Sequence, residues 1–171
     1  WAYVSEGLDD KRVRSRFLMV PETGEIYIGA SGGDVFQILD GAEHWTRVIG
    51  GLGVARSIEA DPRDSKSLFL ATNNGLFRSM DQGNTWFPSG LYNLAVRALT
   101  IVGTESATVF AGTEAGTFRL ANNGKWMSAN TGSTSLEMNS IVANPVSINV
   151  LYAVSGEGDI WKSENGAQTW G

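Results

Sequence analysis

A repeat of about 42 residues runs through the whole chain and constrains its fold more than any other feature. Each copy contains a short apolar segment that ends in a glycine. The four segments are IYIGASGG (26–33), LFLATNNG (68–75), VFAGTEAG (109–116) and LYAVSGEG (151–158). A tryptophan follows each of them, at Trp45, Trp86, Trp126 and Trp170, and Trp1 is interpreted as the same tryptophan of a preceding copy. Repeats of this length predict a solenoid, a propeller or another array.

Each repeat has the composition of short β-strands. The glycine-terminated segments are rich in β-branched and aromatic residues and are bounded by turn-forming residues, which favours strands. A candidate strand precedes each of them: RFLMV (16–20), RSIEA (56–60), RALTI (97–101) and NSIVA (139–143). A third strand holds Phe36, Phe77, Phe118 or Trp161, and a fourth starts at each tryptophan. Four strands in about 40–45 residues is typical of one β-propeller blade.

The predicted fold class is therefore all-β, a β-propeller built of four-stranded antiparallel blades. We interpret residues 1–171 as a single propeller unit of about four blades. The repeats span approximately 12–53, 54–93, 94–134 and 135–171, with residues 1–8 as the outer strand of a flanking blade. The last blade is expected to have three strands, and Trp1–Ser5 to complete a blade whose other strands come from elsewhere. Three sources stay open for those strands: the chain's own C-terminal strands, a second copy, or further blades of a longer parent protein.

Residues 79–86, SMDQGNTW, match the motif S-x-D-x-G-x-T-W at every defined position. The matching residues are Ser79, Asp81, Gly83, Thr85 and Trp86. In this motif the chain resembles the Asp-box, or BNR-repeat, family of β-propellers. The fourth copy keeps Ser163, Thr169 and Trp170, with Asn165 in the Asp position and Ala167 in the Gly position. The first and third copies are more degenerate, and the third lacks one residue before Trp126.

The residues of the box are those that a tight turn requires. The Asp carboxylate can accept backbone N–H bonds, Gly allows a positive φ, and Trp can fold its ring over the hairpin. One carboxylate does not supply the oxygen ligands that Ca²⁺ takes, so we interpret the boxes as structural turns that hold no metal. The family resemblance implies that the boxes lie on the face away from the functional one. It places the functional face at the loops that enter the innermost strands and at the glycine turns.

One set of polar residues repeats at equivalent positions near the start of the innermost strands. These residues are Arg16, Arg56, Arg97 and Asn139. If the innermost strands surround a central channel, these side chains ring its mouth. Converging guanidinium groups would there bind carboxylate, phosphate or sulfate, or an acidic surface of a partner protein. The alternative is that the arginines stabilise the blade junctions and bind no ligand.

Composition removes several classes of function. The chain has no cysteine and one histidine, His44, which excludes thiolate and multi-histidine metal sites, and we expect no cofactor. The net charge of −5 argues against a nucleic-acid partner. No apolar run has the length of a membrane span. We interpret His44 as a surface turn residue, and Asp61 with Asp64 as a solvated turn.

The resemblance also implies two kinds of enzyme. Sialidases of the family hold a sugar carboxylate with three arginines and use a tyrosine paired with a glutamate, and xyloglucan-cleaving relatives use two carboxylates across a groove. The tyrosines here are Tyr3, Tyr27, Tyr92 and Tyr152, of which Tyr27 and Tyr152 are expected in the core. Acids expected on the loop face are Glu6, Asp9, Asp10, Asp34, Glu114, Glu137 and Glu157. We assign no catalytic residue.

The sequence thus favours a non-catalytic binding or assembly module that uses the loop face around the arginines. It resembles photosystem II assembly and stability factors and secreted BNR-repeat proteins, which implies an extracytoplasmic location (periplasmic, lumenal or secreted). The expected partner is an acidic protein surface or an anionic ligand or glycan, with a homo-oligomer or further blades as possible neighbours. The alternative is a glycan-directed hydrolase or lectin segment of the sialidase or xyloglucanase type.

Overall fold

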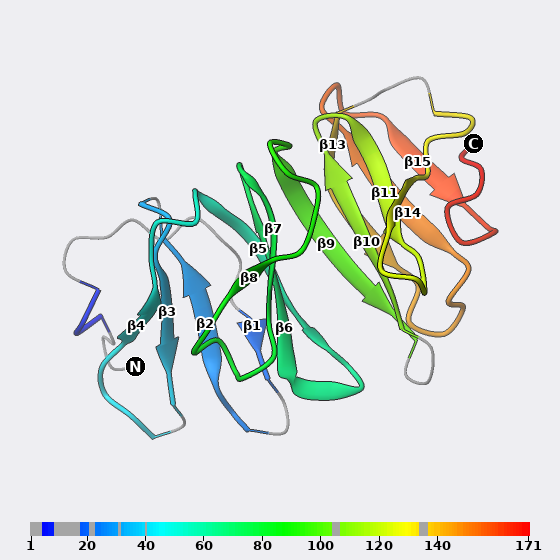
Figure 1. Ribbon diagram of the computed structural model, residues 1–171. Helices are drawn as coiled ribbons and strands as arrows, with labels where there is room; N and C mark the ends of the chain where they lie inside the picture. The colour runs from blue at the N-terminus through cyan, green and yellow to red at the C-terminus, as the bar shows by residue number, and fades with distance from the viewer. Residues whose placement is uncertain are drawn as a thin grey trace.

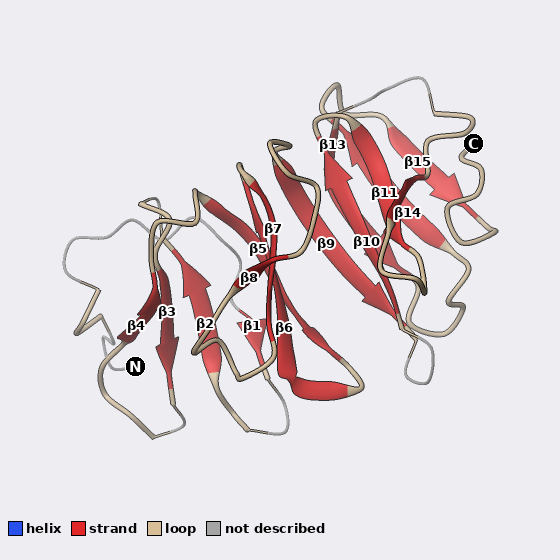
Figure 2. Ribbon diagram, viewed as in Figure 1, coloured by secondary structure: helices blue, strands red, loops and turns tan. Residues whose placement is uncertain are grey.

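The computed structural model describes residues 5–8, 18–20, 23–30, 32–39, 41–103, 107–133 and 137–171. This part of the chain consists of strands, turns and loops, and the fifteen strands form four antiparallel sheets (Figures 1 and 2). Within it, no helix is long and apolar enough to cross a membrane.

Each sheet takes its strands in chain order, so that every strand pairs with the next one along the sequence. The first sheet contains β1 (Leu18–Met19), β2 (Ile26–Gly29), β3 (Val35–Ile38) and β4 (Thr46–Ile49). The second contains β5 (Ala55–Asp61), β6 (Asp64–Thr72), β7 (Gly75–Ser79) and β8 (Phe87–Pro88). The third contains β9 (Val96–Val102), β10 (Thr108–Thr113), β11 (Gly116–Leu120) and β12 (Trp126–Ser128). The fourth contains β13 (Met138–Ala143), β14 (Leu151–Ser155) and β15 (Ile160–Ser163).

The predicted glycine turns join the second and third strands of the sheets. Gly75 and Gly116 have φ angles of 124° and 104°, a region that disfavours residues with a Cβ. In the second sheet, the Thr72 hydroxyl donates to the Gly75 carbonyl over 2.9 Å and accepts from the Asn74 N–H over 3.0 Å. Thr113 makes the same pair of bonds in the third sheet. The repeated glycine is therefore required by the geometry of the turn.

The first strands of the four sheets, β1, β5, β9 and β13, lie next to one another, and each sheet stacks on the following one (Figure 1). The hydrophobic core is divided accordingly into layers between consecutive sheets. Tyr27 packs with Leu68 between the first and second sheets, and Phe69 with Leu99 between the second and third. Phe110 packs with Ile141 between the third and fourth. This arrangement of blades confirms the predicted β-propeller fold class.

The outer face of the fourth sheet corrects one expectation. Tyr152 was expected in the core, like the equivalent residues Tyr27, Phe69 and Phe110, which are at most 2% exposed. Tyr152 is instead 39% exposed, and its neighbour Ile160 is 73% exposed. The reason is positional, because the equivalent aromatics of the first three sheets are covered by the next sheet.

The turn between β5 and β6 corrects a second expectation. Asp61 was expected in a solvated turn, but its side chain is 2% exposed and pairs with Arg63, whose Nη2 lies 2.7 Å from Asp61 Oδ2. Arg63 also donates from Nε and from its backbone N–H to Asp61 Oδ1. These bonds from Arg63 hold the pKa of the Asp61 carboxyl below its ordinary value. The turn is thus built around a buried carboxylate that pairs with an exposed arginine.

The tryptophans of the first and fourth boxes form the same backbone hydrogen bond with a segment that precedes their sheet. The Trp45 N–H donates to the Glu6 carbonyl over 2.7 Å, as the Trp170 N–H donates to the Thr131 carbonyl over 2.8 Å. Residues 5–8 therefore lie beside the first sheet as residue 131 lies beside the fourth. His44 is exposed there, as expected. The fourth sheet has three strands, also as expected, and the part of the prediction that concerns Trp1–Val4 lies outside the described residues.

Candidate functional site

The repeated polar residues occupy equivalent places on the loop face. Arg56, Arg97 and Asn139 are each the second residue of the first strand of their sheet, β5, β9 and β13. Arg56 and Asn139 are exposed, and Arg97 is partly buried. Arg16 lies outside the described residues. The prediction that these positions are equivalent thus holds for the three described residues, while their role in binding stays a prediction.

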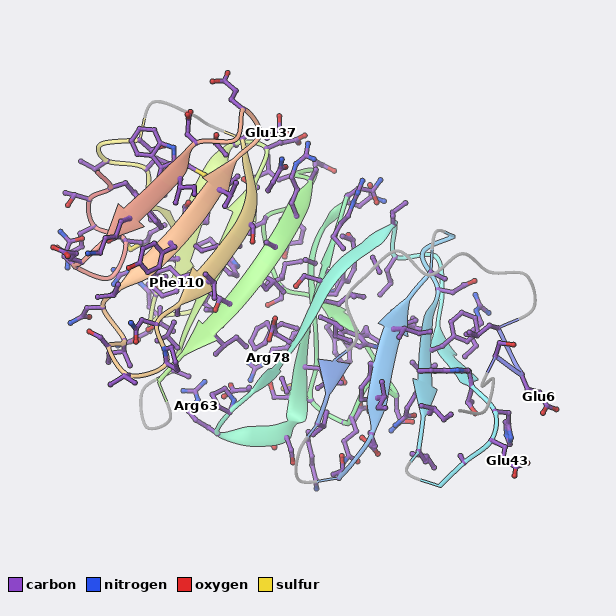
Figure 3. The ribbon with its side chains drawn as sticks, turned by 180° about the vertical axis from the view of Figure 1, so that it is seen from behind. Glu6, Glu43, Arg63, Arg78, Phe110 and Glu137 are labelled. Atoms are coloured by element: carbon purple, nitrogen blue, oxygen red, sulfur yellow. The ribbon has the colours of Figure 1, made fainter. Side chains whose placement is uncertain are left out.

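Arg97 is the member of this set that contacts another blade. Its Nη2 lies 2.9 Å from an oxygen of Glu137, which precedes β13 and lies at the top of the molecule in Figure 3. The Nε of Arg97 is buried and has no hydrogen-bond partner among the residues that the structure describes. The Nη2 group of Arg97 therefore joins the third blade to the fourth. Its Nε–H group could still donate a hydrogen bond to an added acceptor.

Two other carboxylates of this face hold the fold together. Glu114 exchanges two bonds with Ala95: its Oε1 accepts from the Ala95 N–H over 3.1 Å, and its own N–H donates to the Ala95 carbonyl over 3.2 Å. Asn73 makes the same two contacts with Val54 one blade earlier, so this position is a structural tether between the glycine turn and the start of the innermost strand of the same blade. Asp34 is 5% exposed and pairs with Arg47 over 2.6 Å.

The remaining acids of the loop face and the tyrosines differ in their surroundings. Glu6 and Glu157 are exposed, and Asp9, Asp10 and Tyr3 lie outside the described residues. The Tyr27 hydroxyl lies 2.8 Å from a Glu25 oxygen and 2.8 Å from the Gln82 carbonyl. Burial, followed by the contact with Glu25, raises the pKa of Tyr27 far above its ordinary value. That shift is the opposite of what a nucleophilic tyrosine needs.

The Asp-box of the second blade forms a closed network of hydrogen bonds. Ser79 Oγ accepts from the N–H groups of Asp81 and Gly83 and donates to Asp81 Oδ1 over 2.8 Å. Asp81 also accepts from the Thr85 N–H over 2.8 Å and from the Thr85 hydroxyl over 2.5 Å. These Thr85 bonds come first among the causes that lower the pKa of Asp81. The oxygens of the box are thus engaged within the turn, and no group of three or more metal-ligating side chains occurs in the described part of the chain.

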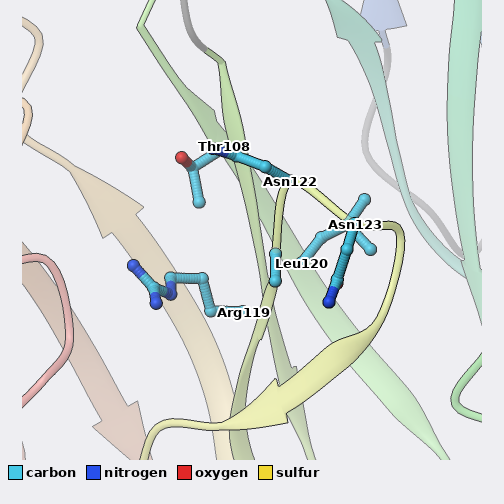
Figure 4. Close-up of a pocket in the computed structure, with 6 residues that line it drawn as sticks. Thr108, Arg119, Leu120, Asn122 and Asn123 are labelled. Atoms are coloured by element: carbon cyan, nitrogen blue, oxygen red, sulfur yellow. The ribbon is translucent and has the colours of Figure 1, made fainter.

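The degenerate third box produces a feature that the sequence analysis missed. Asn122 and Asn123 of this turn line a hollow of about 340 Å³ together with Thr108 and Arg119 (Figure 4). A second hollow of about 350 Å³ lies on the other side of the same turn and is lined by Arg63 and Arg78. The missing residue before Trp126 is the signal in the sequence that could have indicated this space.

The stacked sheets, the first strands lying side by side and the repeated turns define the chain as a β-propeller unit. No known family model matches the chain, and no curated protein is similar to it in sequence. Solved structures are similar in fold. An ancestral GH74 enzyme superposes with a TM-score of 0.76 at 18% identity, over 99% of this chain and 25% of that protein.

Two further structures give the same fold. A GH74 xyloglucanase from Xanthomonas campestris has a TM-score of 0.70 at 15% identity, over 93% of this chain and 29% of its own. An auxiliary nutrient binding protein from Bacteroides thetaiotaomicron has a TM-score of 0.72 at 14% identity, over 91% of this chain and 40% of its own. The chain therefore spans less than half of the length of these proteins. At such identities the likeness establishes the fold.

Proposed function

We propose that the chain is a non-catalytic β-propeller module of the Asp-box type that binds an acidic partner on its loop face. Arg56 and Arg97 supply the charge, with Arg16 and Asn139 at the equivalent positions of the first and fourth blades. The partner is an acidic protein surface or an anionic ligand or glycan, and the setting is extracytoplasmic. An extracellular domain of a one-component system from B. thetaiotaomicron, with a TM-score of 0.76 at 14% identity over 92% of this chain, supports that setting.

One observation carries the proposal. The loop-face carboxylates Asp34, Glu114 and Glu137 each already contact a cation or a backbone N–H, whereas Arg56 is exposed and Arg97 Nε is buried without an acceptor among the described residues. A buried donor without a partner costs free energy, which an incoming carboxylate would recover. In a chain of net charge −5, these arginines would form a local cationic site for such a carboxylate.

The test measures binding of a fluorescent poly-glutamate peptide to the full chain at low and high sodium chloride. Replacing Arg56 and Arg97 by Gln is expected to weaken binding about tenfold or more at low salt and to flatten the salt dependence. The matched control is Lys66→Gln with Lys125→Gln, which removes the same charge near the boxes on the opposite face. Equal loss in both variants, or no loss in the arginine variant, would contradict the proposal. Adding Arg16→Gln then tests the first blade.

A glycan-directed hydrolase or lectin segment is the second candidate, because two of the similar structures are GH74 enzymes. Incubation with xyloglucan, other β-glucans and sialosides distinguishes the two functions. We expect no release of sugar. Turnover at enzyme-like rates that is lost in a variant of Glu137 or Glu157 would favour the hydrolase.

A further inference from the structure

Three junctions between consecutive blades are built from the same three parts. The first part is an aromatic residue in the second strand of a sheet, and the second part is the polar residue that lies opposite it in the third strand. The third part is the box turn of the next blade, which both residues face. The pairs are Tyr27 with Gln37, Phe69 with Arg78, and Phe110 with Arg119. Because the parts are equivalent, a difference in the space that they enclose reflects the side chains and the turn.

The first and third junctions are closed or nearly closed. In the first, the Tyr27 hydroxyl reaches the Gln82 carbonyl of the next box and accepts from Gln37 Nε2 over 2.9 Å. In the third, Arg119 and Phe110 border a space of about 80 Å³ against Gly166 of the fourth box. These two boxes have the full length of eight residues between the serine and the tryptophan positions.

The second junction is open, because the third box is one residue shorter. It encloses about 350 Å³ between Phe69 and Arg78 of the second blade and Leu120 to Gly124 of the third. The side chain of Asn122 occupies the Asp position of the box but makes no hydrogen bond within the described part of the chain. Its amide therefore remains available to a ligand on one side of the hollow.

The opposite side of the hollow is cationic. Arg63 lines it but is engaged with the buried Asp61, so that the two charges compensate each other. The guanidinium of Arg78 lies 5.1 Å from the centre of the Phe69 ring, and its Nε donates to Ser67 Oγ over 3.0 Å. Its terminal nitrogens have no hydrogen-bond partner among the described residues. Arg78 lies near the Arg63–Asp61 pair (Figure 3) and also helps to lower the pKa of Asp61, so that the two arginines and one carboxylate leave one positive charge in excess.

We propose that this hollow between the second and third blades binds the carboxylate group of a small ligand. Arg78 is held by Phe69 and Ser67 so that its terminal nitrogens can donate to the carboxylate, and Asn122 donates from the other side. The volume is at the lower end of the range for ligand pockets and fits a group the size of one monosaccharide. This site lies on the box face, away from Arg56 and Arg97, and is independent of the function proposed above.

The experiment is an NMR titration of the full chain, followed at the backbone amides of Asn122 and Gly124. The probes are D-glucuronate for a sugar carboxylate and N-acetylglutamate for a peptide carboxylate, with D-glucose as the neutral control. We expect saturable shifts with at least one carboxylate and none with glucose. Saturation with one probe alone identifies the source of the carboxylate. Absence of saturable shifts with both carboxylates would overturn the proposal.

Two variants decide whether Arg78 is the contact. Arg78→Gln is expected to weaken carboxylate binding about tenfold or more, because it removes a charge-assisted hydrogen bond. Lys66→Gln, which removes the same charge from the box face of the second blade and does not line the hollow, is the matched control and should bind like the wild type. Arg78→Lys keeps the charge without the planar guanidinium and should give an intermediate affinity. Wild-type affinity in a folded Arg78→Gln variant, or equal losses in the two Gln variants, would refute the assignment.

Discussion

The Asp-boxes of the second and fourth blades form nearly the same turn from different residues. In both, a buried serine hydroxyl accepts two backbone N–H groups, from Asp81 and Gly83 in one and from Asn165 and Ala167 in the other. In both, one side-chain oxygen of the third residue accepts from the backbone N–H of the threonine. The turn thus requires a side-chain oxygen at the third position that accepts this hydrogen bond, and both Asp and Asn supply one.

The two boxes differ in the second contact with the threonine. The Thr85 hydroxyl donates to Asp81, whereas Thr169 accepts from the Asn165 side-chain nitrogen over 2.8 Å. A threonine hydroxyl can do either, so the network stays complete when the charge is removed. The tryptophans differ as well. Trp86 Nε1 donates to Gly83 within its own turn, and Trp170 Nε1 donates to Ala129 of the preceding blade. The complete motif is therefore the more local structure, and the altered one is tied to its neighbour.

Removing the shared serine tests whether the two boxes are energetically equivalent. Ser79→Ala and Ser163→Ala each leave a buried N–H group without its acceptor, and we expect each to lower the free energy of unfolding by about 1–3 kcal/mol. Urea unfolding of the two variants measures the loss. A loss at one position that is several times the other would show that the similar geometry hides unequal contributions.

The glycine position sharpens the comparison. Gly83 has a φ of 81°, and a Cβ there would lie 3.2 Å from the Tyr27 ring, so Gly83→Ala should cost about 1–2 kcal/mol. Ala167 already has a φ of 62° and is buried. In Ala167→Gly, relief of strain offsets the lost methyl burial, and we expect a change within about 0.5 kcal/mol of zero. Thermal unfolding of Gly83→Ala and Ala167→Gly measures the two changes in stability. A large gain in stability for Ala167→Gly would mean that the buried methyl group of Ala167 contributes nothing.

Exchanging the third residue separates charge from geometry. The folded protein holds the pKa of Asp81 below its ordinary value of 3.8. Its stabilising contribution is therefore fully present above that value and is lost as the pH falls through the folded pKa. We expect Asp81→Asn to fold normally and to flatten the loss of stability in acid, and Asn165→Asp to steepen it. Urea midpoints between neutral and strongly acidic pH measure both. Asp61 also contributes to the loss of stability in acid, but it is unchanged in both variants. A dependence of stability on pH that is the same in the Asp81→Asn variant and the wild type would therefore contradict the assignment to Asp81.

The third box gives the smallest expected effect. Asn122 takes the same position as Asn165 but makes no side-chain hydrogen bond within the described part of the chain. Asn122→Ala should therefore change the free energy of unfolding by no more than about 0.5 kcal/mol, whereas Asn165→Ala should cost about 1 kcal/mol or more. Equal costs in the two variants would show that Asn122 also holds its turn.

Much of the fold could be predicted, because strands and turns depend on local sequence that the repeat shows four times. The glycine turns and the three strands of the last sheet follow from the spacing of Gly75, Gly116 and the tryptophans. The burial of Asp61 could not be predicted in this way. It depends on Arg63 folding back over the carboxylate, and the tripeptide Asp-Pro-Arg reads equally well as a solvated turn.

The candidate sites were predictable to a smaller extent. The equivalence of Arg56, Arg97 and Asn139 follows from the register of the repeat, but the ion pair of Arg97 with Glu137 is a contact between blades that no single repeat contains. The hollow beside Arg78 depends on a missing residue in the next blade. Sequence shows that the residue is missing, whereas only packing shows that the space stays open.

Because each described sheet stacks only on its neighbours in the chain, the free energy of opening one sheet depends on how many neighbouring sheets it contacts. The substantial contacts between described strands of different sheets all join consecutive sheets. Opening of the second sheet therefore breaks two interfaces, and opening of the fourth, among the described sheets, breaks one. Amide protons of β14 and β15 should exchange with solvent through a lower-energy local opening than those of β6 and β10. The free energy of opening would then be higher for the second and third sheets than for the fourth.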